Sequence, residues 1–415
     1  MRLTKLVTRT SKMVPSEEES KNAQLLIRAG YVHKEMSGVY SYLPLGKIVL
    51  DNIANIVREE INKTGAFEVQ MSSLQSRELW EKTGRWDDKL VDNWFKTKLA
   101  NGQELGLGLT HEEPVINSLL PFVSSYKDLP FAVYQVQTKF RNEIRAKSGL
   151  MRSRELLMKD QYSFSKSEDD HKKYYEEMAD VYLKIYSRFG VGDITYRTYA
   201  DGGIFSEFSD EFQTLSEVGE DTIYVDEEKG IAINKEVYKD DVLKKLGLDK
   251  SKLVERKAVE VGNIFSLGTK YTKELGLDYI DENGKKQDIV MGCYGIGVSR
   301  MMGLLAEHFS DEKGLSWPKE VAPAIVYLIN IGNDSEVVKA ADEAYDELST
   351  KGFKVIYDDR DLRPGEKFAD ADLLGIPYRV VVSEKNLAEK KYELKARNED
   401  SLHILSMQEL LKYIA

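Results

Sequence analysis

Residues 292–301 have the sequence GCYGIGVSRM, a glycine-rich turn that ends in an arginine. The residues before the turn are strand-like, and those after it have the apolar periodicity of a helix, which places Arg300 in the first helical turn. A dinucleotide-binding turn would have a third glycine there, so that the helix could pack tightly on the strand. A cation at a helix N-terminus opposes the helix dipole unless an anion joins it. We therefore expect Gly295 and Gly297 to let an anionic ligand reach Arg300, and the alternative is an ion pair with Glu307 or Asp311.

A second charged element lies between two strand-like segments, AVYQVQTKF and ELLMKDQYSF, within residues 131–164. The polar stretch RNEIRAKSG between them predicts a long antiparallel hairpin with a charged loop. Arg141 and Glu143 alternate with their neighbours, so both side chains should leave one face of the strand, with Arg152 and Arg154 on the facing strand. Such an arginine cradle suits a polyphosphate. A ladder of surface ion pairs is the alternative.

Bulk composition sets wide limits on the class of protein. The chain has 415 residues, of which 42% are apolar and 31% charged, and this length is enough for two or three domains. No apolar run approaches the length of a membrane span, and the basic N-terminus resembles a solvated lead-in. The single cysteine, Cys293, fits a reducing compartment, so we expect a cytoplasmic protein. A net charge of −11 neither selects nor excludes an RNA partner.

Helical spacing of Val49, Ile53, Ile56 and Val57 predicts a helix over 46–64, followed by a short strand at 67–71. Residues 171–189 are also predicted to be helical. The stretch 220–257 has the pattern of a small hairpin and is too short to hold much core of its own. Two prolines at 318 and 323 bracket a linker. Beyond it, strand and helix alternate, which predicts a small α/β domain with a mostly parallel sheet.

These motifs resemble those of a known enzyme family. TKFRNE resembles the Phe-Arg-x-Glu second motif of class II aminoacyl-tRNA synthetases, and GIGVSR resembles their Gly-x-Gly-x-x-Arg third motif. Residues 46–72 resemble the first motif, which forms the dimer interface. An ordered set of further stretches is similar to bacterial-type prolyl-tRNA synthetases in particular: RAGYVHKEMSGVYSYLPLG, ELWEKTGRW, LTHEE, KFRNEIRAKSGLMRSRELLMKDQYSF, EVGNIFSLGTKY and DDRDLRPGEKFADADLLGIP.

The resemblance implies a fold and a domain order. It implies an α+β class II catalytic domain, with an antiparallel sheet flanked by helices, over residues 1–219 and 258–318. Residues 220–257 would be a short remnant insertion, and residues 324–415 a C-terminal α/β anticodon-binding domain. The family relationship further implies a homodimer that is not attached to a membrane.

The resemblance also implies a reaction with ATP, Mg²⁺, L-proline and tRNA(Pro). The carboxylate of proline attacks the α-phosphate of ATP, and the prolyl group then passes from prolyl-adenylate to the tRNA. By analogy, Arg141 spans the proline carboxylate and the α-phosphate, Glu143 accepts from the adenine amino group, and Arg300 stacks on adenine. Two further nucleotide contacts fall on Arg152 and Gln213, and the tRNA acceptor end would meet Arg145.

The implied proline site lies in a different part of the sequence. Thr110 and Glu112, in LTHEE, match the residues that hold the substrate nitrogen. A hydroxyl and a carboxylate satisfy the two N–H donors of a secondary ammonium. Met158, Asp160 and Tyr162 alternate along one strand and match residues of the pocket wall. His111 is expected to be structural, Cys293 a packed residue rather than a nucleophile, and no resident metal ligand is predicted.

The sequence departs from the family pattern at four positions. Ser72 stands where the first motif usually ends in proline, and Leu156 replaces an aromatic residue that stacks on adenine. Asp210 and Asn263 replace two histidines that we expect near the proline pocket. Neither of these two replacements falls on a nucleotide motif.

Three functional hypotheses follow, and the first is favoured: a prolyl-tRNA synthetase. A paralogue that makes an aminoacyl-adenylate for another acceptor, and a catalytically inactive binding or accessory protein, are the alternatives. The retained anticodon-binding stretch disfavours the paralogue, and intact Arg141, Glu143 and Arg300 disfavour the inactive protein. The short insertion further predicts that the enzyme cannot hydrolyse alanyl-tRNA(Pro) itself.

Overall fold

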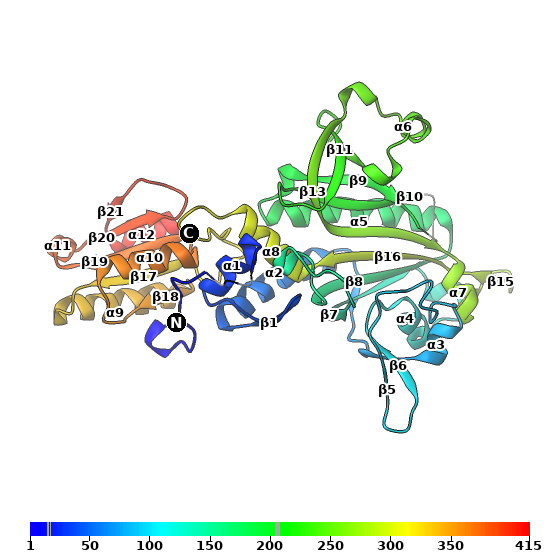
Figure 1. Ribbon diagram of the computed structural model, residues 1–415, viewed down its shortest axis with the longest axis horizontal. Coiled ribbons are helices and arrows are strands. Elements are labelled where there is room, and N and C mark those ends of the chain that lie inside the picture. Colours follow the sequence, from blue (N-terminus) through cyan, green and yellow to red (C-terminus); the bar gives the residue numbers. More distant parts are fainter. Residues whose placement is uncertain (15, 17, 204–207) are drawn as a thin grey trace.

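The computed structural model describes residues 1–415 except 15, 17 and 204–207, and Figure 1 shows an elongated molecule with two unequal parts. The larger part is built on a nine-stranded sheet in the order β10-β9-β12-β11-β13-β16-β8-β7-β3. Most neighbouring strands are antiparallel, but β12 with β9 and β3 with β7 are parallel pairs. The strands are β3 (Phe67–Glu68), β7 (Phe131–Phe140), β8 (Glu155–Ser165), β9 (Thr195–Asp201), β10 (Phe208–Leu215), β11 (Asp221–Asp226), β12 (Ile231–Asn234), β13 (Val254–Gly268) and β16 (Val290–Gly297).

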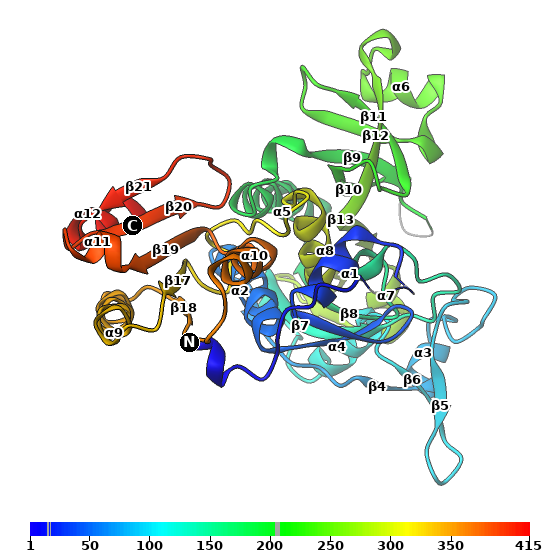
Figure 2. The same cartoon turned by 60° about the vertical axis from the view of Figure 1, so that its left-hand side comes forward.

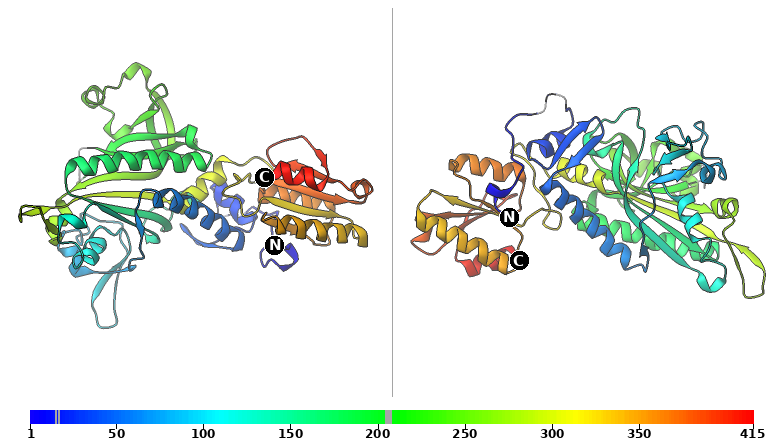
Figure 3. Two further views of the ribbon diagram at one scale, coloured as in Figure 1. Left: turned by 180° about the vertical axis from the view of Figure 1, so that it is seen from behind. Right: turned by 90° about the horizontal axis from the view of Figure 1, so that it is seen from below.

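Helices cover one face of this sheet and form the main core. α5 (Glu168–Arg188) packs along β8, β9, β13 and β16, as Figure 3 shows from behind. α1 (Lys21–Arg28), α2 (Pro44–Asn62) and α8 (Val298–His308) pack against one another beside it. Buried side chains from all four helices share one hydrophobic cluster with the sheet. The predicted helices at 46–64, 171–189 and 298–308 are confirmed to within three residues at each end.

The apolar stripe of α2 faces this core. Val49, Ile53, Ile56 and Val57 are each at most 4% exposed within a single chain, so the stripe is not available to a partner. The stripe is therefore core, the alternative that helical spacing alone leaves open, and the dimer expected from the helix over 46–64 stays a prediction. The exposed apolar residue of this region is Phe67, which is 68% exposed on the edge strand β3.

The opposite face of the sheet carries smaller elements. α4 (Glu112–Leu119) and α7 (Lys270–Leu275) enclose a second hydrophobic cluster with β7, β8 and β16. Beside them is a three-stranded sheet, β4 (Leu74–Ser76), β6 (Glu104–Leu107) and β5 (Lys96–Lys98), with α3 (Arg77–Glu81). A two-stranded sheet joins β14 (Asp278–Ile280) and β15 (Lys286–Asp288), and another joins β1 (Val32–Met36) and β2 (Val39–Tyr42).

Residues 220–257 extend the nine-stranded sheet rather than folding apart from it. β11 and β12 form the predicted hairpin, which pairs with β13 on one side and with β9 on the other. β13 continues across position 257 without a break. α6 (Asp240–Leu246) closes one of two small apolar clusters here, with side chains of β9 and β10, and Figure 2 shows this region projecting from the sheet.

The smaller part is the C-terminal domain, a five-stranded sheet in the order β18-β17-β19-β20-β21. The first three strands are parallel, as predicted, and the two added antiparallel strands were not anticipated from the sequence. The strands are β17 (Val326–Ile331), β18 (Val355–Asp358), β19 (Tyr378–Ser383), β20 (Tyr392–Ala396) and β21 (His403–Leu405). Four helices flank them: α9 (Ser335–Thr350), α10 (Pro364–Leu374), α11 (Glu384–Leu387) and α12 (Met407–Ile414).

The N-terminal residues contact this C-terminal domain instead of lying in solvent. Arg2 pairs with Asp342 at 2.8 Å, and the amide of Tyr357 donates to the carbonyl of Met1 at 2.8 Å. The solvated lead-in that we expected from the charge of this segment is therefore wrong, because its basic and hydroxyl side chains meet carboxylates of the C-terminal domain. Among the described residues, no helix has the length and apolar character needed to cross a bilayer.

Candidate active site

Two cavities meet at Arg141, on the sheet face opposite α5. The first, of about 270 Å³, is lined by Arg141, Glu143, Arg152 and Arg300, and the second, of about 300 Å³, by Arg141, Thr110, Glu112, Met158 and Asp160. Arg141 follows β7 directly, and its amide still donates to the carbonyl of Arg154 at 2.8 Å. The four charged hairpin residues thus lie just beyond the paired strands β7 and β8, not on them as predicted.

The Arg141 guanidinium is poised between these cavities. It forms no ion pair within the described residues, although it is half-buried. Burial, and then the nearby charge of Arg300, lower the pKa of Arg141. Two cations that face each other across a cavity repel, so an anion bound between them is favoured by both.

Arg300 lies in the first turn of α8, as predicted, but its partner is a different one. Its Nη1 donates to the carbonyl of Glu260 at 2.5 Å and contacts the Glu260 carboxylate at 3.2 Å. The alternative ion pairs with Glu307 and Asp311 are wrong: Glu307 accepts from Asn22, and Asp311 pairs with Arg397. Among the described residues, the buried Nε of Arg300 has no hydrogen-bond partner.

The two glycines before Arg300 make room for different side chains. A side chain at Gly297 would come within 3.0 Å of the Arg300 side chain, and one at Gly295 within 2.9 Å of Asn263 Oδ1. Gly295 lines the second cavity rather than the first. The glycines thus make room for the side chains that form the walls, as well as for a ligand.

The wall of the first cavity is an ion-pair network. Arg152 donates to Glu143 through Nε and Nη2, at 3.0 and 2.9 Å, and through Nη1 to Glu220 at 2.7 Å. Leu156, the residue that replaces an expected aromatic, also lines this cavity. Gln213 does not line it: the side chain is fully buried and donates to Glu211 and Asp221, and Asp221 forms part of the wall.

The second cavity is built around two adjacent carboxylates. Thr110 Oγ1 donates to Glu112 at 2.7 and 2.8 Å, and Arg85 contacts Glu112 at 3.2 Å and Glu113 at 3.1 Å. Burial would raise the pKa of Glu112, but Arg85 and Thr110 hold it below its usual value. Burial raises the pKa of Glu113 to about 7. One guanidinium thus faces two carboxyl groups, and a bound cation would favour the form in which both are ionised.

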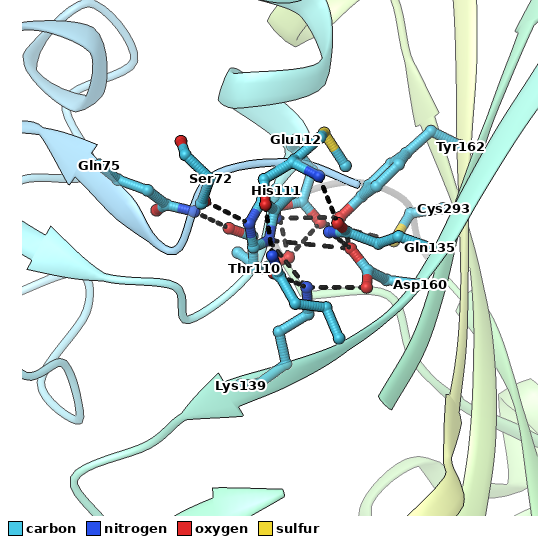
Figure 4. Close-up of polar contacts among 12 residues, drawn as sticks. Ser72, Gln75, Thr110, His111, Glu112, Gln135, Lys139, Asp160, Tyr162 and Cys293 are labelled. Carbon is cyan, nitrogen blue, oxygen red and sulfur yellow. Dashed lines mark hydrogen bonds and ion pairs between the residues drawn. The ribbon is translucent and has the colours of Figure 1, made fainter. Parts of the chain in front are cut away.

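Asp160 forms the floor of this cavity and is 3% exposed. Tyr162 lies behind it and does not line the cavity: its hydroxyl donates to Asp160 at 2.9 Å and accepts from the amide of His111 (Figure 4). His111 is fully buried, in agreement with the structural role expected for it. Cys293 lines the cavity beside Glu112, and burial raises the pKa of its thiol, which suits a packed residue.

Two of the three remaining predicted positions lie away from both cavities. Arg145 is exposed in the loop that follows β7. Asn263 lines the second cavity, whereas Asp210 faces α5 on the other side of the sheet, where it pairs with Arg197 at 2.7 Å. Our placement of Asp210 near the proline pocket is therefore wrong, because neighbouring strand residues point to opposite faces.

Sequence reasoning missed three charged residues of the site. Arg85 comes from the segment between α3 and β5, Lys139 from the end of β7, and Glu260 from β13. Lys139 could have been found from the sequence. Polar residues stand at every second position of an otherwise apolar strand, at Gln135, Gln137 and Lys139, and this pattern indicates a polar buried face.

Comparison with known proteins connects this geometry to a family. Residues 95–309 match the family described as tRNA synthetase class II core domain (G, H, P, S and T), and residues 325–415 match the anticodon binding domain. A proline–tRNA ligase of Rickettsia akari is 37% identical over 96% of both chains, and one of a Wolbachia strain is 38% identical over the full length of both.

A solved structure gives the same fold. Giardia lamblia prolyl-tRNA synthetase in complex with prolyl-adenylate matches with a TM-score of 0.77 at 19% identity, over 93% of this chain and 74% of that one. The expected α+β class II catalytic domain with a C-terminal anticodon-binding domain is confirmed. The chain belongs to the prolyl-tRNA synthetase (proline–tRNA ligase) family of class II aminoacyl-tRNA synthetases.

Proposed function

We propose that this protein activates L-proline with ATP to prolyl-adenylate and transfers the prolyl group to tRNA(Pro). The observation that carries the proposal is the unpaired Arg141 guanidinium at the junction of two cavities, one lined by arginines and the other by carboxylates. A reaction that joins an amino acid carboxylate to a phosphate needs a cation at the junction, an ammonium site on one side and a polyphosphate site on the other.

In the proposed mechanism, the second cavity holds proline. Thr110 and Glu112 accept the two N–H groups of the secondary ammonium, and Met158 and Asp160 limit the space around the ring. The Thr110 hydroxyl already donates to Glu112, which fixes both oxygen positions before the substrate enters. The proline carboxylate then points toward Arg141, which lines both cavities.

The first cavity holds ATP in this proposal. Glu143, held by Arg152, accepts from the adenine amino group, and Arg300 contacts the nucleotide from the other side. A proline carboxylate oxygen bonds to the α-phosphorus while pyrophosphate leaves, and Arg141 stabilises the charge that builds on the phosphorus oxygens. Because the groups involved need little proton transfer, orientation and electrostatics supply most of the catalysis. Gln213 would act indirectly, through Asp221.

Mg²⁺ fits the donor set beside the first cavity. Burial, and then the charge of Glu260, raise the pKa of Glu211 to about 8, so a dication would relieve a repulsion between two carboxylates. Mg²⁺ is usually held by one or two carboxylates together with substrate phosphates. In the described parts of the chain, no three His, Cys, Asp or Glu residues are grouped to hold a metal. Glu211 and Glu260 would hold the ion, which when bound neutralises phosphate charge.

We further propose the domain limits 1–219 and 258–318 for catalysis, 220–257 for a short insertion and 324–415 for anticodon binding. Arg145 would contact the tRNA acceptor end, because it is exposed on the loop next to the first cavity. We also propose a homodimer and a cytoplasmic location, the compartment that the single cysteine fits.

Pyrophosphate–ATP exchange with each of the twenty amino acids tests this function. We expect proline to drive exchange far more efficiently than the others, and the purified protein then to charge tRNA(Pro). Strongest exchange with threonine or serine would refute proline as the substrate. Exchange with proline but no charging of tRNA(Pro) would favour the paralogue that serves another acceptor, and an absence of exchange would favour an inactive protein.

A further inference from the structure

A buried lysine lies under the carboxylate of the second cavity. Lys139 is fully buried, and its Nζ lies 2.7 Å from Asp160 Oδ1, 2.8 Å from His111 Nδ1 and 3.3 Å from Gln137 Oε1. A lysine ammonium has three donors and no acceptor, and it meets one ion-pair partner and two hydrogen-bond acceptors here. This geometry is that of a charged lysine and of a histidine whose Nδ1 carries no proton.

The contact at the second ring nitrogen of His111, Nε2, fixes the tautomer of the ring. His111 Nε2 lies 3.0 Å from the carbonyl oxygen of Ser72, which can only accept, so the ring proton is on Nε2. Burial, and then the charge of Lys139, lower the pKa of His111 to about 4, so the ring is neutral near pH 7. Lys139 is thereby tied through a single neutral ring to the backbone of Ser72.

Two glutamines of β7 also connect the segment before Ser72 to Asp160 and Lys139. Gln135 accepts from the amide of Met71 at 3.0 Å and donates to Asp160 Oδ2 at 3.0 Å. Gln137 donates to the carbonyl of Met71 and accepts from Lys139. Gln135, Gln137 and Lys139 lie at every second position of β7 and so share one face. As Figure 4 shows, the segment that contains Ser72 is joined to Asp160 by several independent hydrogen bonds.

This network decides how charge is distributed in the cavity. A buried carboxylate without a cation would either take up a proton or compete with Glu112 for the substrate ammonium. Gln135 and Tyr162 both donate to Asp160 Oδ2, and Lys139 forms an ion pair with Oδ1. Glu112 instead shares the one guanidinium of Arg85 with Glu113.

We propose that Lys139, held in place by His111, is a positioning residue for proline: it neutralises and fixes Asp160, so that the substrate ammonium is directed to Glu112. The proposal rests on the function proposed above and adds a determinant of amino acid affinity to it. Neither Lys139 nor His111 touches the substrate, since both act through Asp160.

The test is a double-mutant cycle on the purified full-length protein, read as separate KM values for proline and ATP in pyrophosphate exchange. Lys139→Met should raise the KM for proline about tenfold or more, because it leaves Asp160 buried without its cation, and change the KM for ATP less than about twofold. In an Asp160→Asn background, the same lysine substitution should change the KM for proline less than about twofold. Equal losses in the two backgrounds would overturn the proposal.

Lys159→Met is the matched control. Lys159 is also fully buried, but it lies on the other face of the sheet, where its Nζ donates to Tyr182 Oη at 2.8 Å. Its removal should lower thermal stability while leaving the KM for proline within about twofold of wild type. A rise as large as that of Lys139→Met would show that loss of any buried lysine has this effect, and the proposal would fail.

Two substitutions of His111 keep the test decisive if Lys139→Met does not fold. Gln can offer one donor and one acceptor as the His111 ring does, so His111→Gln should retain the wild-type KM for proline within about threefold, whereas His111→Leu should raise it. Identical KM values for the two variants would overturn the role of His111. Wild-type protein is assayed first: exchange without preference for proline refutes the proposed function and this inference together, whereas normal wild-type exchange with unaffected variants refutes the inference alone.

Discussion

Arg141 and Arg300 differ in how firmly the protein holds them, and this difference sets what each substitution removes. Arg141 has no ionic partner among the described residues, whereas Arg300 is fixed by the backbone and carboxylate of Glu260. Removing Arg141 takes away a cation and leaves no unpaired group behind. Removing Arg300 also leaves Glu260 without its cation, so some loss of stability should accompany the loss of activity.

We therefore expect Arg141→Ala and Arg300→Ala each to lower the rate of pyrophosphate exchange by about 10²–10³-fold, the usual effect of deleting a donor that stabilises developing charge. Exchange kinetics measure the loss, and circular dichroism melting curves show that the variants are folded. Only Arg300→Ala should melt at a lower temperature than wild type. Near-native exchange by either folded variant would contradict the role assigned to that residue.

Arg145 should affect a different step. It is exposed in the loop beyond β7 and lines neither cavity, so Arg145→Ala should slow the transfer of proline to tRNA(Pro) and leave exchange within about twofold of wild type. Lys147→Ala, another exposed cation of the same loop, is the matched control for a general loss of positive charge. Equal losses in transfer and exchange would place Arg145 at the nucleotide instead.

Lys159 gives a prediction about stability and pH. Burial lowers the pKa of Lys159 from 10.5 to about 7. Between pH 7 and 10.5 the unfolded chain binds this proton and the folded chain does not, so the lysine's contribution to stability rises with pH across that window. The difference in melting temperature between Lys159→Met and wild type should therefore change steadily from pH 7 to 9, with wild type gaining. A difference that is constant with pH would show that the folded-state pKa is not lowered.

The motif residues of the site could be predicted from the sequence because each motif is local. Glycine spacing places Arg300 in a helical turn, and strand periodicity places Met158 and Asp160 on one face. Arg85 could not be predicted, because its contact with Glu112 joins segments that only the tertiary fold brings together. Asp210 was assigned to the wrong face, since periodicity gives alternation along a strand but not which face meets the cavity.

At the level of helices and strands, sequence periodicity predicted where the elements lie along the chain better than it predicted which strands pair with each other. The hairpin of β7 and β8, the four long helices α2, α5, α8 and α9, and the three parallel strands of the C-terminal domain were all expected. β20 and β21 were missed, because they are short edge elements in a polar sequence and their pairing depends on β19. The insertion was expected to be a small hairpin with little core of its own, and its strands pair with β9 and β13, which supply the apolar partners it lacks.

Edge strand β3 is where we expect the proposed homodimer to form. It pairs only with β7 among the described strands, and an edge strand offers unpaired backbone groups to a second chain. Phe67 on this strand is 68% exposed. Phe67→Glu should therefore shift the protein toward a monomer, which light scattering measures across a concentration series.

Ile144→Glu is a control for this substitution, because Ile144 is 88% exposed but lies in the loop beyond β7. It should leave the association state unchanged. A Phe67→Glu protein that associates as wild type does would remove β3 from the interface, and a wild-type monomer with full activity would show that no dimer is required.

On the scale of the whole molecule, the two domains share one hydrophobic core. Side chains of β17, β18, β19 and α10 join the cluster formed by α1, α2, α5 and α8. Tyr31 connects the parts further: its hydroxyl donates to the carbonyl of Leu374 at 2.8 Å and accepts from Trp317 at 3.1 Å. Such a continuous core indicates that the C-terminal domain keeps a fixed orientation to the active site, which favours the delivery of one tRNA end when the other is bound.

The small insertion at the far end of the sheet bears on the accuracy of the enzyme. Residues 220–257 supply two strands, one α-helix and two short 3₁₀ turns, and their apolar side chains form two small clusters shared with β9, β10 and β13. A domain of this size cannot bury enough surface for a hydrolytic site with its own core. Alanine is smaller than proline, so the second cavity cannot exclude it by size, and each missing methylene weakens binding by only about 1–3 kcal/mol.

We therefore expect the enzyme to form alanyl-adenylate slowly and to be unable to clear alanyl-tRNA(Pro). Purified protein is incubated with preformed alanyl-tRNA(Pro), and deacylation is followed beside a sample without enzyme. The two rates should be equal. As a control for protein quality, the same preparation must charge tRNA(Pro) with proline. Rapid hydrolysis that depends on the enzyme would mean that an editing site exists elsewhere in the fold. Because the strands of the insertion pair with β9 and β13, the first place to search for such a site would be the groove beside Asp221 and Glu220, where the insertion borders the first cavity.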